Sequence, residues 1–317
     1  MTGRLSGASG NLLTGSLCYL NSSFVWGLNI PLTAALFASF DPFILAPLRL
    51  GIASVILALA MLLVLGVGAF RLPISVQRLL IMSACLSSFF VFYNLGLLYT
   101  HTITAAAIMA GSPVYSALTT RWLTGARLEK GFAGAALLTM VGAGIAIAGG
   151  AQEGGQAIAL QGGEILIVAS FVGWTAYSIL AQRWFPADTP QLQRTLLSSV
   201  AAIGWLMLVW VLLRILDLVG PLNREPSAEA LRYLFVTAVL STALGAFTWN
   251  IGVARLGIQA GVMWQNTVPV FAVLVSMLGF DLQPTREQLV GGAVVLSGVL
   301  YMQWHRWRAV RKDPTAS

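Results

Sequence analysis

The sequence predicts an all-α integral membrane protein with ten transmembrane helices in two inverted five-helix repeats. Three observations lead to this fold class: a composition poor in charge, ten long apolar runs, and matching motifs in the two halves. Hydrophobic residues make up 57% of the 317 residues and charged residues only 9%, whereas soluble domains carry about 25% charged residues. So few charges cannot cover a surface that faces water, but apolar side chains can face lipid.

The apolar runs have the length that a membrane-spanning helix requires. A bilayer core about 30 Å thick needs roughly 20 apolar residues per helix. Short links with turn-forming residues, such as Asp41-Pro42, separate the runs. We therefore expect one transmembrane unit over residues 1–317, without a separate soluble domain. The predicted spans are 12–37, 42–66, 76–98, 104–122, 130–149, 162–184, 191–216, 231–253, 260–279 and 288–306.

The two halves share motifs in the same order. The matching pairs are Tyr93-Asn94-Leu95-Gly96 with Trp249-Asn250-Ile251-Gly252, Ser112-Pro113-Val114 with Val268-Pro269-Val270, and Glu129 before Gly134-Ala135 with Glu287 before Gly292-Ala293. Five spans per half is an odd number, so the second half must enter the membrane from the opposite side. We therefore expect inverted repeats over residues 12–149 and 162–306, an arrangement typical of alternating access.

Basic residues gather at one side of the predicted membrane, and this asymmetry predicts the orientation. With a cytoplasmic N-terminus, the outer ends hold only Arg214, Arg224, Arg232 and Arg286. The inner ends hold Arg4, Arg71, Arg78, Arg121, Arg127, Lys130, Arg183, Arg255, Arg306, Arg308, Arg311 and Lys312. We expect a multi-pass protein of the inner (plasma) membrane with both termini in the cytoplasm. Because these charges end apolar runs and do not line one face, the net charge of +7 does not indicate nucleic-acid binding.

These features resemble the drug/metabolite transporter superfamily in its EamA branch. Arg49 within Pro47-Leu48-Arg49-Leu50, and the two proline segments that each precede a glutamate, carry the resemblance together with the ten spans. The likeness covers nearly the whole chain and is greatest to YddG-type exporters of aromatic amino acids. It implies a basket of helices around a central cavity, formed mainly by spans 1, 3, 4, 6, 8 and 9.

Polar and aromatic side chains in those spans are candidate substrate ligands. A polar side chain inside a span is costly unless it faces protein or a wet cavity. Rings beside amides and hydroxyls can stack on a ring or a cation while they hydrogen-bond its polar groups. The alternative for the Trp and Tyr residues is an anchoring role at the membrane interface. The candidates are Trp26, Asn29, Tyr93, Asn94, Trp174, Tyr177, Trp249, Asn250, Trp264, Gln265 and Asn266.

Four further residues bear on helix movement and energy coupling. Pro113 and Pro269 each remove an amide hydrogen in mid-span, so each either shapes and gates the cavity or makes a static kink. Glu164, at the start of the sixth span, is the acid expected to lie within the membrane, and it is therefore the candidate for proton coupling. Arg49 is expected to be the one buried charge, with a structural role preferred over binding of a substrate carboxylate.

The predicted function is export of amino acids, aromatic and other neutral ones, and of related metabolites. With so little embedded acid, we expect facilitated diffusion. The alternative is a proton-coupled multidrug or metabolite efflux protein. A membrane-embedded enzyme is a remote third class, because it would need a clustered nucleophile, base or metal site. We expect no cofactor or metal, a small-molecule substrate and the lipid bilayer as partners, and a monomer.

Overall fold

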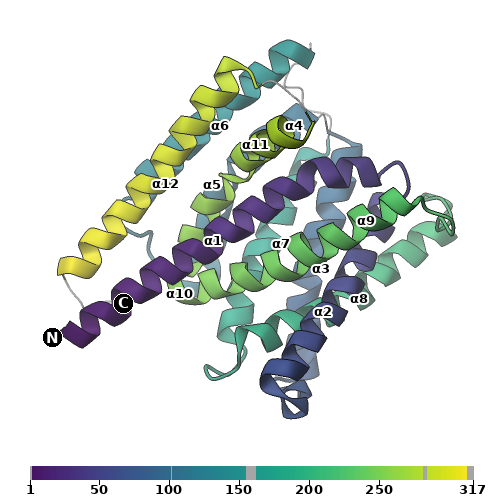
Figure 1. Ribbon diagram of the computed structural model, residues 1–317, viewed down its shortest axis with the longest axis horizontal. Helices are drawn as coiled ribbons and strands as arrows, with labels where there is room; N and C mark the ends of the chain where they lie inside the picture. Colours follow the sequence, from purple (N-terminus) through teal and green to yellow (C-terminus); the bar gives the residue numbers. More distant parts are fainter. Residues whose placement is uncertain (1, 101, 155–161, 281–283, 313–317) are drawn as a thin grey trace.

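A computed structural model describes residues 2–100, 102–154, 162–280 and 284–312, and their regular secondary structure is helical throughout (Figure 1). Of the basic residues behind the predicted orientation, the side chains of Arg4, Arg311 and Lys312 lie outside the described part. The elements are α1 (Thr2–Leu36), α2 (Pro42–Leu65), the 3₁₀ turn η1 (Val67–Phe70), α3 (Val76–Leu98), α4 (Thr102–Ala110), α5 (Ser112–Thr124), α6 (Phe132–Gly154), α7 (Glu164–Arg183), α8 (Gln191–Ile215), α9 (Ala228–Val236), the π-helical η2 (Thr237–Leu244), α10 (Gly245–Gln265), α11 (Val268–Phe280) and α12 (Arg286–Lys312).

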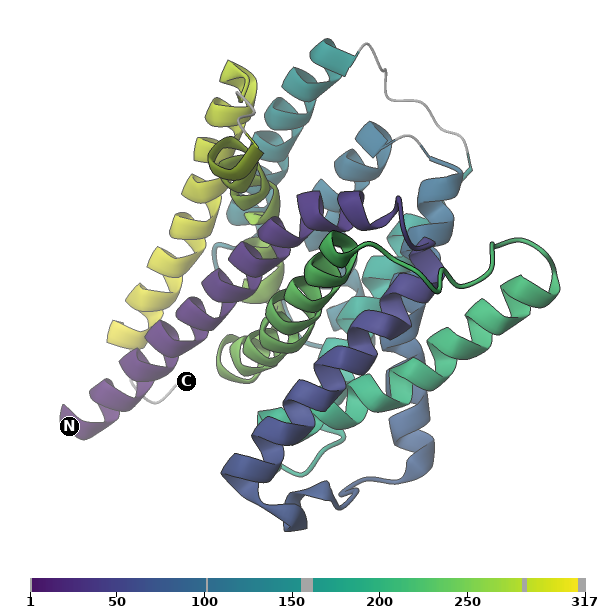
Figure 2. The ribbon, with the colours of Figure 1, turned by 45° about the vertical axis from the view of Figure 1, so that its right-hand side comes forward.

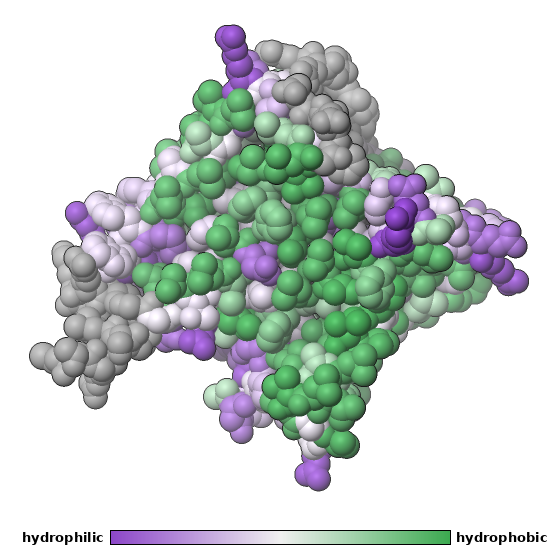
Figure 3. Space-filling model, in the orientation of Figure 1, coloured by the Kyte–Doolittle hydropathy of each residue, from purple (hydrophilic) through white to green (hydrophobic). Residues whose placement is uncertain are grey.

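Apolar side chains cover most of the face shown in Figure 3. Five helical stretches of the described residues are long and apolar enough to cross a membrane. Large apolar residues on these helices are strongly exposed; Leu63 of α2, for example, is 85% exposed. An apolar surface of this extent is stable against lipid and unfavourable against water. The predicted transmembrane character is therefore confirmed.

Two interruptions divide predicted spans in ways that the apolar pattern does not show, and a third, at Gly257, lies in the predicted link between spans 231–253 and 260–279. The run 104–122 consists of α4 and α5, which meet at Gly111, and the run 260–279 consists of the end of α10 and α11, which meet at residues 266–267. Within α10, Gly257 has a φ of +74° and divides this element into two helical parts. The eighth run, 231–253, contains most of α9, then η2 and the first part of α10. The ten crossings and the inversion of the halves stay predictions.

Helix pairing follows a pattern that recurs when the two halves are exchanged. The first span packs on the eighth through α1 and α10, and the third packs on the sixth through α3 and α7. Likewise α1 packs on α11 of the ninth span, and α7 packs on α4 and α5 of the fourth. This correspondence supports the predicted repeat.

Helices α6 and α12 pack along each other at one side of the bundle (Figures 1 and 2). Their closest approach is between Gly142 and Gly291. A Cβ added at Gly142 would lie 2.6 Å from the carbonyl oxygen of Gly291, and one added at Gly291 would lie 2.4 Å from that of Gly142. Small residues are what allow two transmembrane helices to approach so closely.

The start of α2 sets the position of Arg49 relative to the bundle. Asp41 caps this helix, because its Oδ1 accepts the backbone N–H groups of Phe43 (2.9 Å) and Ile44 (3.1 Å). Pro42 occupies the first helical position, where its missing N–H has no intrahelical partner to lose. Arg49 follows seven positions later, about 10 Å along the helix axis at 1.5 Å per residue.

Candidate substrate-binding site

Three tryptophans from three helices meet at the centre of the bundle. Trp26 of α1, Trp174 of α7 and Trp249 of α10 have ring centroids 5.5, 5.2 and 5.5 Å apart for the pairs 26–174, 26–249 and 174–249. These separations and the tilted ring planes are typical of favourable aromatic packing. Trp249 is fully buried and Trp174 is 6% exposed. We refer to these three side chains as the indole triad.

Further rings extend the indole triad towards α1 and α3. Tyr19 packs edge-on against Trp249 at 5.1 Å, and Phe89 lies 5.3 Å from Trp174. Phe89 also stacks on the predicted candidate Tyr93 at 5.9 Å. The sequence analysis missed Tyr19 and Phe89. Phe89 could have been found from its spacing, because it lies one helical turn before Tyr93 on the same face of α3.

Several candidate residues hydrogen-bond to protein groups that fix the triad. The Trp249 Nε1–H donates to Ser178 Oγ at 3.0 Å, and the Asn250 amide donates to Tyr177 Oη at 3.1 Å and to Thr195 Oγ1 at 2.9 Å. These bonds tie α10 to α7 and α8. The Trp26 Nε1–H donates to the backbone carbonyl of Ser241 at 3.0 Å. Trp249 therefore lies in the core, and the interface position considered for it from the sequence is wrong.

Buried polar atoms without a partner are concentrated in the candidate residues. Among the described residues, nine buried side-chain nitrogen or oxygen atoms have no hydrogen-bond partner, and four of them belong to predicted site residues. An unmet donor or acceptor inside a protein costs about 1–3 kcal/mol, so each case requires an explanation such as a ligand or a water molecule. The four atoms are Trp174 Nε1, Trp264 Nε1, Asn250 Oδ1 and Gln265 Oε1. Of these, Trp174 Nε1 belongs to the indole triad and Asn250 Oδ1 to the residue that binds Tyr177 next to Trp174, and an unmet donor and acceptor beside rings suit a small polar, aromatic ligand.

The two interrupted helices meet each other where they are interrupted. Asn266, after the end of α10, accepts a hydrogen bond from Ser112 Oγ at 3.3 Å and donates to the carbonyl of Ala110 at 3.5 Å. Pro113 and Pro269 stand in the first turns of α5 and α11. Each proline therefore starts a new helix and does not bend a continuous one. Broken helices at membrane depth are tolerated where the irregular backbone is buried in protein or lines a cavity.

Three further candidates make hydrogen bonds outside the indole triad. Asn29 Oδ1 accepts from Thr33 Oγ1 at 3.0 Å on the same face of α1 as Trp26. Asn94 donates to the carbonyl of Pro42 at 2.9 Å and so ties α3 to the start of α2. Glu164 is the first residue of α7, where its Oε2 accepts the backbone N–H of Gly162 at 2.8 Å. Its carboxylate thus lies at a helix end.

Two arginines, not one, are buried charges within the helices, so the prediction for Arg49 alone is wrong. Arg194 of α8 is only 3% exposed. Its guanidinium is solvated by oxygen atoms at the C-terminal end of α7 and in the following turn, where carbonyl groups lack intrahelical partners. It donates to oxygens of Ala181, Gln182, Pro186, Ala187 and Thr189 at 2.8–3.4 Å. Within the part of the chain that the structure describes, Arg49 donates only to Thr242 Oγ1 and Thr33 Oγ1, both at 3.3 Å.

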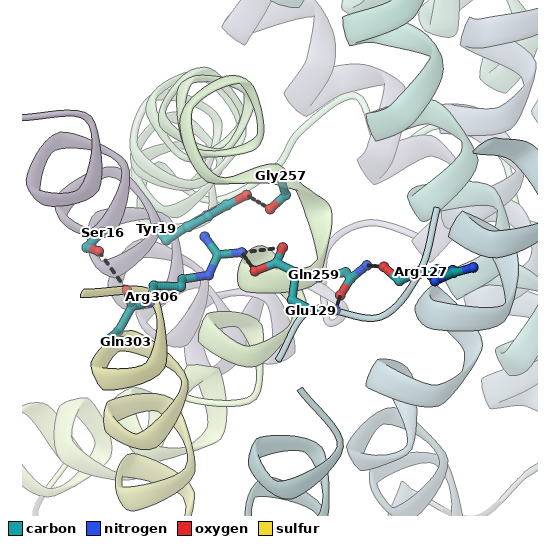
Figure 4. Close-up of polar contacts among 8 residues, drawn as sticks. All are labelled: Ser16, Tyr19, Arg127, Glu129, Gly257, Gln259, Gln303 and Arg306. Carbon is teal, nitrogen blue, oxygen red and sulfur yellow. Dashed lines mark hydrogen bonds and ion pairs between the residues drawn. The ribbon is translucent and has the colours of Figure 1, made fainter. Parts of the chain in front are cut away.

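A polar network joins four parts of the chain at the end that the predicted orientation places in the cytoplasm (Figure 4). Arg306 of α12 forms an ion pair with Glu129 at 2.5 Å. Gln259 accepts from the backbone N–H of Glu129 at 2.9 Å and donates to the carbonyl of Arg127 at 3.2 Å. Tyr19 Oη donates to the carbonyl of Gly257 at 2.8 Å. We call this the inner-end network; it links α1, α12, the link before α6 and the second part of α10.

A cavity of about 760 Å³ lies apart from the candidate residues and includes none of them. It opens between the link before α3 and the end of α7. Its lining consists of Leu72, Pro73, Ile74, Ser75, Gln77, Arg78, Arg183, Trp184, Phe185 and Pro186. The rings of the indole triad, by contrast, pack directly against one another.

Comparisons with known proteins agree with this architecture. Residues 161–304 match the EamA-like transporter family. The uncharacterized transporter YyaM of Bacillus subtilis is 24% identical over 263 residues, which cover 82% of this chain and 84% of the relative. A probable terminal-alkyne amino-acid exporter of Streptantibioticus cattleyicolor is 27% identical over 257 residues, 80% of each chain.

A protein of known crystal structure has the same fold. Its structure covers 95% of this chain and 99% of its own length with a TM-score of 0.78, at 21% sequence identity. The second half of the chain is thus similar to the EamA-like transporter family, the whole chain is similar to two proteins named as transporters or exporters, and the exposed apolar helices agree with a membrane location.

Proposed function

We propose that this chain exports amino acids, aromatic and other neutral ones, and related metabolites across the inner membrane by alternating access. The observation that carries the proposal is the indole triad, whose Trp174 indole N–H has no partner among the described residues, and the same holds for Oδ1 of the neighbouring Asn250. An aromatic amino acid offers a ring that stacks on the indoles and polar groups that complete the unmet hydrogen bonds. The name of one relative, a probable amino-acid exporter, supports the same substrate class.

The proposed mechanism is a rocking movement at the two helix interruptions. The first lies at Gly111, and the second at residues 266–267, where the Asn266 side chain bridges the two. Because the indole triad is packed in this structure, substrate entry requires these helices to separate from one another. Both halves lie in one chain, so a monomer is sufficient for the movement.

We propose uncoupled facilitated diffusion as the energetics. Embedded proton carriers are as a rule acids or histidines, and Glu164 lies at the first residue of α7 with its carboxylate on a backbone N–H. The proton-coupled efflux alternative assigns coupling to this residue. A pH gradient across the membrane distinguishes the two.

Uptake of labelled tryptophan into liposomes that contain the purified protein tests the proposal. We expect entry that is faster than into empty liposomes and independent of an imposed pH gradient. Trp26→Ala and Trp174→Ala should reduce the rate at least about tenfold, because each removes ring contacts worth about 0.5–1.5 kcal/mol apiece. Trp122→Ala is the matched control, since Trp122 of α5 is 80% exposed and should leave the rate unchanged.

Three results would contradict parts of this proposal. Undiminished transport in both folded tryptophan variants would reject the site. Accumulation that depends on the pH gradient and is lost in Glu164→Gln would establish proton coupling. Absence of flux for every amino acid would reject the substrate class and favour drug efflux.

A further inference from the structure

Arg49 holds a positive charge inside the bundle without a compensating negative charge. It is half-buried in α2, about 10 Å beyond the first residue of that helix. Within the described part of the chain, no carboxylate oxygen lies within 4.0 Å of its guanidinium. A cation in this setting is costly unless it is paired or solvated. The free-energy cost of this unpaired guanidinium indicates that the charge of Arg49 has a function.

The present partners of Arg49 leave most of its donor capacity unused. A guanidinium presents five N–H donors in a planar fork. Its Nε and Nη1 each donate to one neutral hydroxyl, at the long distance of 3.3 Å, and among the described residues its Nη2 has no hydrogen-bond partner. The preferred partner of such a fork is a carboxylate, which accepts two parallel hydrogen bonds.

The two hydroxyl partners connect Arg49 to the indole triad from both sides. Thr33 also donates to Asn29 at 3.0 Å, and Asn29 lies one turn after Trp26 on the same face of α1. Thr242 directly follows Ser241, whose carbonyl accepts the Trp26 indole N–H. The guanidinium therefore lies between Thr33 of α1 and Thr242 of η2, which is next in the chain to the residue that binds the Trp26 indole, and η2 packs on both α1 and α2.

We propose that Arg49 binds the α-carboxylate of the transported amino acid while the side chain of the substrate packs on the indole triad. The inference rests on the proposed function and adds its selectivity: substrates that carry a carboxylate are preferred over the corresponding amine or amide. Before substrate arrives, the hydroxyls of Thr33 and Thr242 hold the guanidinium in place. When a carboxylate binds, it supplies the missing negative charge.

Competition assays on tryptophan uptake test this assignment. Tryptophanamide keeps the ring and the amino group of tryptophan but lacks the carboxylate. In the unmodified protein, tryptophan should compete at least about tenfold better than tryptophanamide, as expected for a charge-assisted hydrogen bond of about 1.5–3 kcal/mol. In Arg49→Gln this preference should fall to near unity, and Arg49→Lys should retain part of it because the ammonium keeps the charge without the fork. Arg232→Gln, an exposed arginine of α9, should keep the full preference.

A binding measurement separates this inference from the proposed function. Thermal stabilisation by 3-indolepropionate, a carboxylate without an amino group, reports binding in the absence of flux. Stabilisation of the unmodified protein and not of Arg49→Gln would sustain the carboxylate site even if no amino acid were transported. An unchanged preference for tryptophan over its amide in folded Arg49→Gln would overturn the assignment. If that variant does not fold, equal competition by acid and amide in the unmodified protein or in Arg49→Lys would overturn it, and an intermediate preference in Arg49→Lys would support it.

Discussion

Arg49 and Arg194 both hold a charge within the helical bundle, and their surroundings differ. Arg194 donates to oxygens of five residues around the end of α7, including the 2.8 Å bond to the carbonyl of Pro186. Arg49 has only two hydroxyl partners, at 3.3 Å. The partners of Arg194 are complete within the protein, whereas those of Arg49 leave donors for a ligand. Burial of a charge therefore does not by itself mark a binding site; incomplete pairing does.

The largest effect that tests this contrast is expected for Arg194→Gln. The change removes the donor to the carbonyl oxygens of the buried residues Ala181 and Thr189, and each unmet buried group costs about 1–3 kcal/mol. We expect little folded protein, measured as the monodisperse fraction and the thermal unfolding midpoint in detergent. Arg183→Gln serves as the control, because Arg183 is an exposed arginine at the end of α7, next to the oxygens that Arg194 binds. A stable Arg194→Gln protein with normal transport would remove the contrast between the two arginines.

A smaller effect is expected for Thr33→Val and Thr242→Val. Each substitution removes one neutral hydrogen bond to Arg49 at nearly constant side-chain volume, which is worth about 0.5–1.5 kcal/mol. The KM for tryptophan should rise about two- to tenfold, with the unfolding midpoint nearly unchanged. Thr195→Val is the contrasting variant, because Thr195 accepts from the buried Asn250 and its loss should lower stability. A fall in stability at Thr33 and Thr242 without a change in KM would assign Arg49 a structural role.

A small change in stability, and no change in substrate preference, is expected for a third arginine, Arg306, which pairs with Glu129. The two side chains are 12% and 37% exposed, and ion pairs with solvent access contribute about 0–1 kcal/mol. Arg306→Gln should therefore alter the unfolding free energy by less than about 1 kcal/mol. A much larger loss would show that a carboxylate partner at the inner end matters as much as the carbonyl set around Arg194. Glu129→Gln provides the reciprocal measurement.

Much of the helical layout could be predicted from the apolar runs, because bilayer thickness fixes helix length. The predicted spans 76–98, 42–66 and 191–216 agree with α3, α2 and α8 to within one residue at each end. The apolar pattern does not predict the interruptions at Gly111 and at residues 266–267, whereas Gly257 lies in the predicted link between the spans 231–253 and 260–279. The runs 104–122 and 260–279 are each apolar enough to predict one helix, so hydropathy does not reveal the breaks inside them.

The sequence predicts which residues belong to the candidate site better than it predicts how those residues are arranged. Polar and aromatic residues in the expected cavity spans include the indole triad, and Trp26, Trp174 and Trp249 do lie together. Position along one helix does not reveal partners on another. The burial of Trp249 against Ser178, and the carbonyl set around Arg194, depend on where α7 ends relative to α8 and α10. Such contacts become visible only in three dimensions.

The ion pair of the inner-end network has a kinetic consequence. In the proposed repeat, Glu287 corresponds to Glu129, 158 residues earlier. At the same offset, Arg306 corresponds to Ala148, whose side chain cannot form an ion pair with Glu287. In the proposed alternating-access cycle, an ion pair at one end only would favour the state in which Glu129 and Arg306 are in contact. In an uncoupled carrier the ratio Vmax/KM must be the same in both directions, because equal concentrations give no net flux. The separate values of Vmax and KM are free to differ between export and import, and in the proposed carrier this pair is one source of such a difference.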